Sequence, residues 1–537
     1  MAKTAGSDVS PLFIRGSTGL VREVKSVDQF IFNACLVNFG LAGVFIFEFG
    51  PFARPTGNIY LITLIAGAGF LCVAASYAML TSTFPRTGGD YVFNTRILGG
   101  GIGFWLSWLL AVTFATIGSA SVAWVFAHSG IPFALDTVAR VVNSKTIANM
   151  AVTSATTTWT TITATIIIVA SGIMLLRGLG YLMKVQRVLF ALGILGLVAV
   201  TYLLATTDVP SFAHAYNGVA GAGSFNDVLK VAHQQGFGTG WTWLATLSLF
   251  PMLAIPGQIA GGTSWFAGEL QEIRSPKKSF VTMGGVIIVL IVVVLLQTAL
   301  IYHAVGHEFL DSINYMFFNG ITKGYGFASD PNYFAFASIT TGSLPLLIIV
   351  ALGWLAWSFL YLPANLLWPV RFMFAWSFDR MAPPRFASVN RKTNTPVFAT
   401  VFILVLAEIF LLLAQFYGIV KFFIAAGFIV NVGMTGACFS AALFPYLRKE
   451  LFESSPVRMR WAGIPLITIV GIIGGITMVV ADIEFLTVKE FFVWSAPTLW
   501  FSLAVGVSGI VYYIAAVQVG KRHGIDVGLV FDEIPPE

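Results

Sequence analysis

Charged residues are scarce in this sequence, and the scarcity restricts the class of protein it can encode. Only 10% of the 537 residues are Asp, Glu, Lys or Arg, whereas 57% are hydrophobic and the mean hydropathy is +0.85. Soluble domains carry about 25% charged residues. We therefore expect an all-helical integral membrane protein without a soluble domain that could fold alone. The net charge of +6 gives no reason to expect a nucleic-acid partner.

Cysteine and histidine are also scarce. The three cysteines, Cys35, Cys72 and Cys438, fall inside apolar stretches, and an odd, buried set offers no disulfide framework. The six histidines lie at the ends of apolar stretches or between them, which disfavours an active site built on facing helices. His303 and His307 have a metal-like spacing, but two ligands at the end of a span are weak support. We expect no enzymatic activity, no metal site and no cofactor.

Long apolar runs, in contrast, are abundant. A bilayer core of about 30 Å needs roughly 20 apolar residues per helix. Twelve segments of the sequence meet this requirement. We place them at residues 28 to 50, 58 to 82, 102 to 128, 156 to 177, 184 to 206, 239 to 268, 281 to 304, 344 to 376, 396 to 416, 419 to 446, 462 to 481 and 493 to 517. The longest segments between them, at about 129 to 155, 207 to 238 and 305 to 343, are expected to be outer loops.

Lys and Arg are distributed unevenly around these spans. If residues 1 to 27 form a cytoplasmic segment, 23 of the 30 Lys and Arg lie on the cytoplasmic side. The other seven are Arg54, Arg140, Lys145, Lys230, Lys323, Lys421 and Lys489. Because basic residues concentrate in cytoplasmic loops, we expect a multi-pass cell-membrane protein with both termini cytoplasmic, including a tail at 518 to 537. Its basic loops then face anionic lipid. The first 27 residues lack the features of a removable signal peptide.

The sixth span is interrupted by AIPGQIAGG at residues 254 to 262. Backbone groups freed from a helix in hydrocarbon are tolerated only beside protein, water or ligand, so such a span favours a cavity. The first span has a weaker interruption, NFGLAGVF at 38 to 45. If spans 1 to 5 and 6 to 10 are repeats, the interruptions correspond, as in inverted-repeat transporters with a midplane site. The alternative is that the glycines serve close packing and the proline a kink.

Three connecting segments resemble those of the amino acid/polyamine/organocation (APC) superfamily. The first is SYAMLTSTFPRTGGDYVFNTRILGGGIGFWLSW at residues 76 to 108, between the second and third spans. The second is FAGELQEIRSPKKS at 266 to 279, after the sixth span. The third is RFMFAWSFDRMAPPRFASVNRKTNTPVFATVF at 371 to 402, between the eighth and ninth. Their order matches that of the superfamily, so the resemblance covers nearly the whole chain.

The resemblance implies a LeuT-type fold and a secondary-active amino acid transporter of the permease type. Two five-helix repeats in inverted orientation, residues 28 to 206 and 239 to 446, would be followed by two peripheral helices within 462 to 517. The substrate would bind where the first and sixth helices are unwound, at about 38 to 43 and 255 to 262. The implied substrate-binding residues are Asn38, Phe39, Gly40, Leu41, Ala42, Gly43, Ile255, Pro256, Gly257, Gln258, Ile259, Gly261, Asn365, Thr113 and Phe114.

The sequence departs from the resemblance at positions that bear on ion coupling. Proton-coupled relatives carry a lysine in the fifth helix where this sequence has Gly193, and Leu360 and Tyr361 stand near the place of a sodium-site hydroxyl. Exchange, facilitated uptake and proton coupling through another group stay open. Glu408 within the ninth span is a candidate functional carboxylate. We expect Glu269 to pair with one of the cations at 274 to 278.

The predicted substrate is a neutral amino acid. Neither interrupted stretch contains Asp or Glu, and a second ammonium group buried there would need a carboxylate partner. The alternatives are a polyamine or cationic amino acid transporter or exchanger, and a substrate-sensing receptor on the same fold. A channel is disfavoured because the spans supply few polar side chains for a pore lining. The oligomeric state stays open.

Overall fold

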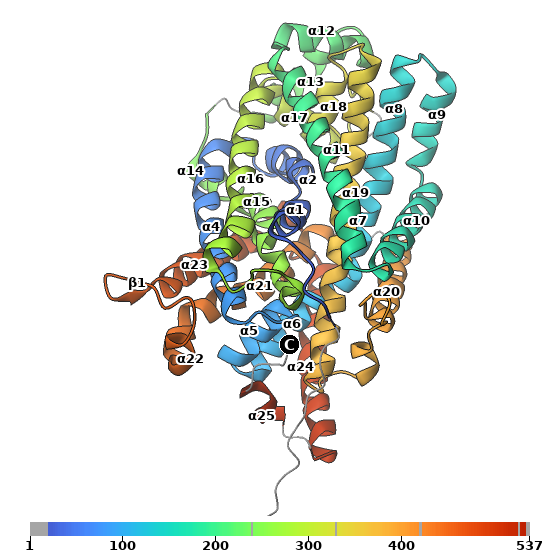
Figure 1. Cartoon of the computed structure of the whole chain (residues 1–537). Helices are drawn as coiled ribbons and strands as arrows, with labels where there is room; N and C mark the ends of the chain where they lie inside the picture. Colours follow the sequence, from blue (N-terminus) through green and yellow to red (C-terminus); the bar gives the residue numbers. More distant parts are fainter. Residues whose placement is uncertain (1–19, 238–239, 328–329, 418–421, 525–526, 533–537) are drawn as a thin grey trace, which may run out of the picture.

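The computed structural model describes residues 20–237, 240–327, 330–417, 422–524 and 527–532. Most of the expected cytoplasmic segment at 1 to 27, and Lys421 among the seven cations expected outside, therefore lie outside the described residues. Twelve helical segments of the described chain are long and apolar enough to cross a membrane, which confirms the predicted number of spans. They pack side by side as an elongated bundle (Figure 1).

Among the first five spans, spans 1 and 3 each consist of several consecutive helices, and the others are single helices. Span 1 consists of α1 (Ser26–Val37), α2 (Phe39–Val44), the π-helix η1 (Phe45–Phe49) and α3 (Gly50–Ala53). Span 2 is α4 (Ile59–Thr83). Span 3 runs through α6 (Gly100–Thr113), the π-helix η2 (Phe114–Gly118), α7 (Ser119–Val125), the π-helix η3 (Phe126–Gly130) and α8 (Ile131–Val141). Spans 4 and 5 are α10 (Thr157–Leu176) and α11 (Leu179–Ala205).

The first of the other seven spans is interrupted. Span 6 consists of α14 (Trp243–Leu247), α15 (Phe250–Gly257) and the 3-10 helix η4 (Gln258–Trp265). The rest are α16 (Pro276–Ala304), α19 (Leu344–Phe378), α20 (Val397–Tyr417), α21 (Phe422–Leu447), α23 (Leu466–Thr487) and α24 (Ala496–Arg522). The predicted boundaries and those of the structure differ most in span 3, which ends at Val141 and not at residue 128.

Shorter elements gather at the two ends of the bundle. We call the end with α22 (Lys449–Glu453) and α25 (Val527–Asp532) the terminal face, which is at the bottom of Figure 1. It also carries α5 (Gly89–Ile97), η5 (Ala267–Glu269), η6 (Pro384–Ala387) and the hairpin of β1 (Arg460–Trp461) and β2 (Ile464–Pro465). The two strands are antiparallel, with Arg460 opposite Pro465.

The opposite end, which we call the loop face, is also largely helical. It carries α12 (Val209–Ala220), α13 (Ser224–Gln235), α17 (His307–Phe318) and α18 (Tyr333–Ser338), at the top of Figure 1. The helix α9 (Lys145–Ser154) and the 3-10 helix η8 (Lys489–Phe491) also connect spans. The three segments expected to be loops thus contain much of their chain as short helices. Their amphipathic sequences bury one face against the bundle, as Phe212 and Phe309 do.

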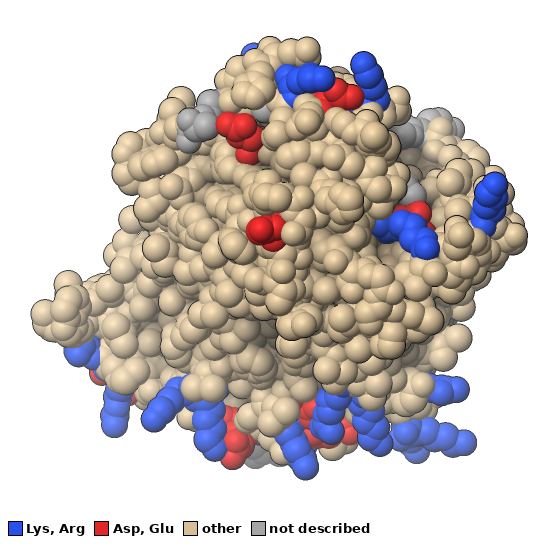
Figure 2. Space-filling model, turned by 90° about the horizontal axis from the view of Figure 1, so that it is seen from above, with Lys and Arg blue, Asp and Glu red and all other residues tan. Residues whose placement is uncertain are grey.

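The charged side chains avoid the middle of the molecule. Figure 2 shows Lys and Arg crowded along the lower edge of the view and fewer of them toward the upper edge, with a broad uncharged surface between. Within the spans, each of the twelve helical segments has an 18-residue window with at most two charged residues, as a bilayer requires, because charged side chains are costly in hydrocarbon.

The interruption of span 1 is confined to a single residue. Asn38 adopts a left-handed conformation (φ 53°, ψ 80°) between α1 and α2. Its side-chain oxygen accepts a hydrogen bond from the backbone N–H of Leu41 at 3.0 Å, which caps α2. The prediction of unwound backbone from 38 to 43 was therefore wrong in extent, because the Asn38 cap restarts the helix at once.

The interruption of span 6 is a change of helix type. The α-helix continues to Gly257, and the 3-10 helix η4 follows from Gln258. Pro256 lacks an N–H, and its ring crowds the carbonyl four residues earlier, so the regular hydrogen-bond ladder ends near it. The predicted unwinding over 255 to 262 was wrong in form, although the position of the break was right.

Candidate functional site

A cavity of about 460 Å³ lies against both interruptions. Its wall is formed by spans 1, 3, 6, 8 and 10, with α17 closing one side near the loop face. Ten of the fifteen predicted site residues line it, namely Asn38, Leu41, Ala42, Thr113, Phe114, Ile255, Pro256, Gln258, Ile259 and Asn365. Its size falls in the range of small-molecule sites, which is about 300–1,000 Å³.

The end of the cavity next to Asn38, which we call the deep end, combines apolar walls with buried polar atoms. Thr113 Oγ1, Gln258 Oε1 and Asn365 Oδ1 are buried without a hydrogen-bond partner among the described residues. The amide of Asn365 donates to Ser119 Oγ at 3.1 Å, which fixes the orientation of its side chain. A buried polar atom without a partner costs about 1–3 kcal/mol. These three atoms can therefore bind polar groups of a ligand.

The other end, which we call the acidic end, carries two carboxylates. Glu48 comes from η1, and Asp330 lies between α17 and α18. Both side chains line the cavity together with His128, and both are buried, at 1% and 6% exposure. The imidazole of His128 stacks on the indole of Trp124 with ring centroids 4.4 Å apart. The two ends of the cavity thus differ in charge.

Aromatic side chains close the deep end toward the terminal face. The ring of Trp265 in η4 stacks on that of Trp368 in α19, with centroids 3.5 Å apart and planes at 9°. The ring of Phe114 lies 4.0 Å from Trp368. The stack separates the cavity from the terminal face.

Ion pairs link the helices below this stack. Arg371 of α19 donates from Nη2 to Glu269 Oε2 at 2.9 Å, and its Nε lies 2.9 Å from Oε1. Burial raises the pKa of Glu269, and the guanidinium of Arg371 opposes the rise. The predicted pairing of Glu269 with residues 274 to 278 was wrong, because the carboxylate points into the protein, whereas Lys278 pairs with the exposed Glu272.

Other contacts on the terminal face are also buried. Arg96 and Asp379 form an ion pair at 2.7 Å, to which Tyr91 adds a hydrogen bond at 2.8 Å. Tyr77 donates a hydrogen bond to the carboxylate of Asp90. Burial raises the pKa of Asp90 to about 7. Ion pairs and hydrogen bonds between buried side chains therefore help to hold the terminal face together.

Four of the predicted site glycines serve packing outside the cavity lining. A Cβ atom on Gly40 or Gly43 would meet Trp357 at 2.3 Å or Tyr333 at 2.1 Å. On Gly257 and Gly261 it would meet Phe70 at 2.7 Å and Tyr77 at 2.4 Å. These glycines were predicted to contact the substrate. A role in helix packing explains them better, because at each position the missing side chain leaves room for an aromatic ring of another helix. Phe39 is the fifth predicted site residue that does not line the cavity. It is buried, and the centroid of its ring lies 5.7 Å from that of Trp357.

Trp357 of α19 connects the interruption of span 1 to span 5. Its carbonyl accepts a hydrogen bond from the Asn38 amide at 2.7 Å. Its indole N–H donates to the carbonyl of Gly193 at 2.9 Å. The space beside Gly193, where a lysine side chain was considered, is thus filled by the indole. Glu408 accepts a hydrogen bond from Thr165 at 2.6 Å, between spans 9 and 4 and outside the cavity lining.

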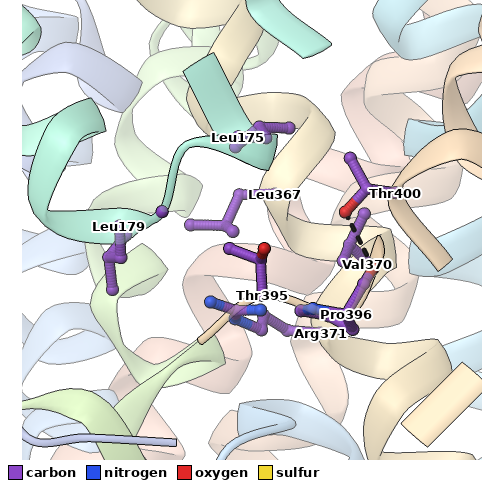
Figure 3. A pocket seen from close by; sticks show the side chains of 9 residues that line it. Leu175, Leu179, Leu367, Val370, Arg371, Thr395, Pro396 and Thr400 are labelled. Carbon is purple, nitrogen blue, oxygen red and sulfur yellow. Dashed lines mark hydrogen bonds between the residues drawn. The ribbon is translucent and has the colours of Figure 1, made fainter. Parts of the chain in front are cut away.

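A much smaller crevice lies beside Arg371. Figure 3 shows Leu175 and Leu179 on the two sides of the α10–α11 turn, near Leu367 and Val370 of α19. Its volume of about 10 Å³ is close to the space of one water molecule. It is too small for an organic ligand, so the large cavity is the candidate site.

The acidic end was not predicted from the sequence. Glu48 lies beyond the interrupted stretch of span 1, and Asp330 lies in a segment between two spans. The available signal was the spacing of Glu48, Phe45, Leu41 and Asn38, which repeats every three or four residues as on one face of a helix. Asp330 follows α17 in a connecting segment, for which periodicity gives no direction.

Comparison with known proteins gives the family. No curated protein matches the chain. The amino acid permease family, however, matches residues 27–516, which is nearly the whole sequence and includes all three connecting segments discussed above. The chain therefore belongs to the amino acid permease family of the APC superfamily, whose members are transporters and not enzymes.

Proposed function

We propose that this permease carries neutral amino acids by alternating access around the large cavity. The proposal includes the two inverted repeats at 28 to 206 and 239 to 446, which place the cavity between their first helices. The observation that carries it is the deep end, where the interruption of span 1 and the change of helix type in span 6 meet beside three unpartnered polar atoms.

The chemistry of the deep end suits an amino acid without a charged side chain. Gln258 and Asn365 offer amide oxygens, and Thr113 a hydroxyl group, that can hydrogen-bond without neutralising a charge. Leu41, Ile259 and other apolar side chains supply the remaining surface. The ends of helices at the two interruptions add partial charges for the amino and carboxyl groups of the ligand.

The two ends of the bundle support alternating access. The terminal face is closed by the Trp265–Trp368 stack and the Glu269–Arg371 ion pair, whereas the cavity extends toward the loop face. A carrier needs a second state in which these contacts open and the loop face closes. A substrate-sensing receptor would bind the ligand without this exchange, so flux separates the two functions.

Transport of cationic amino acids or polyamines is the second candidate. It is favoured by one observation, the presence of Glu48 and Asp330 in the lining of the same cavity. A substrate with a second ammonium group could pair with them. Counterflow in proteoliposomes, with and without pH and sodium gradients, should show exchange of neutral amino acids in preference to arginine, lysine and putrescine. A preference for those cations would refute the proposal and favour the second candidate.

Single substitutions connect the flux to the deep end. Gln258→Ala and Asn365→Ala should each weaken substrate affinity about tenfold, because a hydrogen bond to a ligand contributes about 1–1.5 kcal/mol. Gln297→Ala is the matched control, since Gln297 is also a buried amide but donates to Thr201 away from the cavity, at 2.7 Å. Unchanged affinity in both deep-end variants would place the substrate elsewhere.

We also propose that the terminal face is cytoplasmic. The support is the concentration of Lys and Arg there, which the membrane-insertion machinery retains inside. Ser312 on the loop face is buried in α17, so Asn319→Cys is the better labelling position there. Asn319 and Ser388 are exposed at opposite faces. In intact cells an impermeant thiol reagent should label Asn319→Cys and not Ser388→Cys. Labelling of both would contradict the orientation.

A further inference from the structure

The acidic end of the cavity is not used by a neutral amino acid bound at the deep end. Along the helices of span 1, Asn38 and Glu48 are ten residues apart, or roughly 15 Å. A small amino acid held at Asn38 and Asn365 therefore leaves Glu48 and Asp330 uncontacted. This separation raises the question of what the two carboxylates bind.

Each carboxylate has an oxygen without a hydrogen-bond partner among the described residues. These atoms are Glu48 Oε1 and Asp330 Oδ1. The other oxygen of Asp330 accepts a hydrogen bond from the amide of Asn332 at 3.1 Å, which holds the side chain in place. The two carboxylates are close enough for their charges to interact. Among the described residues, no ion pair involves either of them.

The surroundings of these carboxylates are aromatic. Phe49, Trp124, Phe318 and Phe492 line the same end of the cavity. Burial raises the pKa of the nearby Tyr325, and the negative charges of Asp330 and Glu48 raise it further. The faces of aromatic rings attract cations, by about 0.5–2 kcal/mol each when desolvated. Carboxylates among aromatic rings form a typical environment for an organic ammonium group.

Other positive occupants fit less well. A dehydrated Ca²⁺ ion takes six to eight oxygen ligands, and two carboxylates among aromatic rings supply too few. His128 lines the same cavity, but its ring stacks on that of Trp124, and burial disfavours the charged form of an imidazole. A shared proton would relieve the repulsion between the carboxylates, but it would not account for the aromatic rings.

We propose that Glu48 and Asp330, with the aromatic rings beside them, form a second substrate-binding site that takes an alkylammonium group. In transport it receives the ammonium group of an incoming amino acid before the molecule moves to the deep end. This proposal rests on the proposed function for its role in transport. Its binding chemistry is independent of that role.

Binding of n-butylammonium to the purified protein tests the site directly. Isothermal titration calorimetry should show saturable binding of n-butylammonium and none of 1-butanol, which has a similar shape without the charge. Glu48→Gln and Asp330→Asn should each weaken the binding about tenfold or more. Glu490→Gln is the control, because Glu490 pairs with Arg54 near the loop face but does not line the cavity. It should bind n-butylammonium as tightly as the wild type.

Further variants keep the result interpretable. If Glu48→Gln does not fold, Asp330→Asn decides the test, because Asp330 lies outside the spans. Glu48→Asp keeps the charge and should retain most of the binding. Equal affinity in wild type and both neutralised variants would overturn the proposal. So would an effect on the pH dependence of transport without any effect on n-butylammonium binding, which would identify a proton site. Because calorimetry needs no flux, a protein that carries no neutral amino acid can still bind n-butylammonium.

Discussion

Removal of Glu269 and removal of Arg371, which form a buried ion pair, should lower the free energy of unfolding by different amounts. The two side chains are 3% and 1% exposed and make two contacts of 2.9 Å. Leaving one buried charge without its partner costs about 3–5 kcal/mol. In Glu269→Gln the guanidinium of Arg371 cannot lose its proton, so the full cost applies. In Arg371→Met the carboxylate of Glu269 can take up a proton instead, so the loss of stability should be smaller.

The pH dependence of the two variants follows from the same reasoning. Without Arg371, burial alone acts on Glu269 and raises its pKa further in the folded protein. A raised pKa means that the folded state holds a proton that the unfolded state releases, so stability increases as the pH falls toward the unfolded value near 4.3. Arg371→Met should therefore regain stability between pH 8 and pH 5, and Glu269→Gln should not. The double variant should recover most of the loss, because no unpaired charge remains.

Unfolding of the detergent-solubilised protein by titration with sodium dodecyl sulfate measures these differences. Lys278→Gln is the control, since its ion pair with Glu272 is about half exposed and contributes less than about 1 kcal/mol. The ion pair also holds η5 to α19, so its loss should open the terminal face. A cysteine at Ser264, which is fully buried, would then react faster with a thiol reagent. A loss below about 1 kcal/mol in Glu269→Gln, with no change at Ser264→Cys, would refute the reasoning.

Two further predictions concern the contacts around span 6. Gly257→Ala should lower stability by about 1–3 kcal/mol because its Cβ would lie 2.7 Å from the ring of Phe70, and Phe70→Leu should restore it. Gly506→Ala, with no atom within 4 Å of the added Cβ, should cost nothing, and an equal loss in both would contradict the packing role. The raised pKa of Asp90, about 7, predicts that stability is highest at low pH and declines as the pH rises toward 7. Thermal unfolding at pH 5.5 and 8 should show this decline in the wild type and a smaller one in Asp90→Asn; an unchanged decline would assign it to other groups.

The number of spans and the position of the breaks could be predicted from the sequence because both depend on local composition. Twenty apolar residues predict a span wherever they occur, and Pro256 ends a regular helix in any context. The extent of the breaks could not be predicted in this way. A left-handed Asn38 that caps the next helix is stabilised by the carbonyl of Trp357, 319 residues away. The role of the glycines likewise depends on aromatic rings of other spans.

The charge of the substrate cannot be inferred from the two interrupted stretches alone. The absence of Asp and Glu from them describes only the deep end, whereas the cavity extends along span 1 to Glu48. On a helix, a residue ten positions away can face the same cavity, so its distance along the chain does not remove it from the site. In the proposed mechanism, a substrate that enters from the loop face passes the acidic end before it reaches the deep one. On the two proposals made above, the affinity of each end limits transport separately: the deep end would select what is carried, and the acidic end would select for a positive group on the way in.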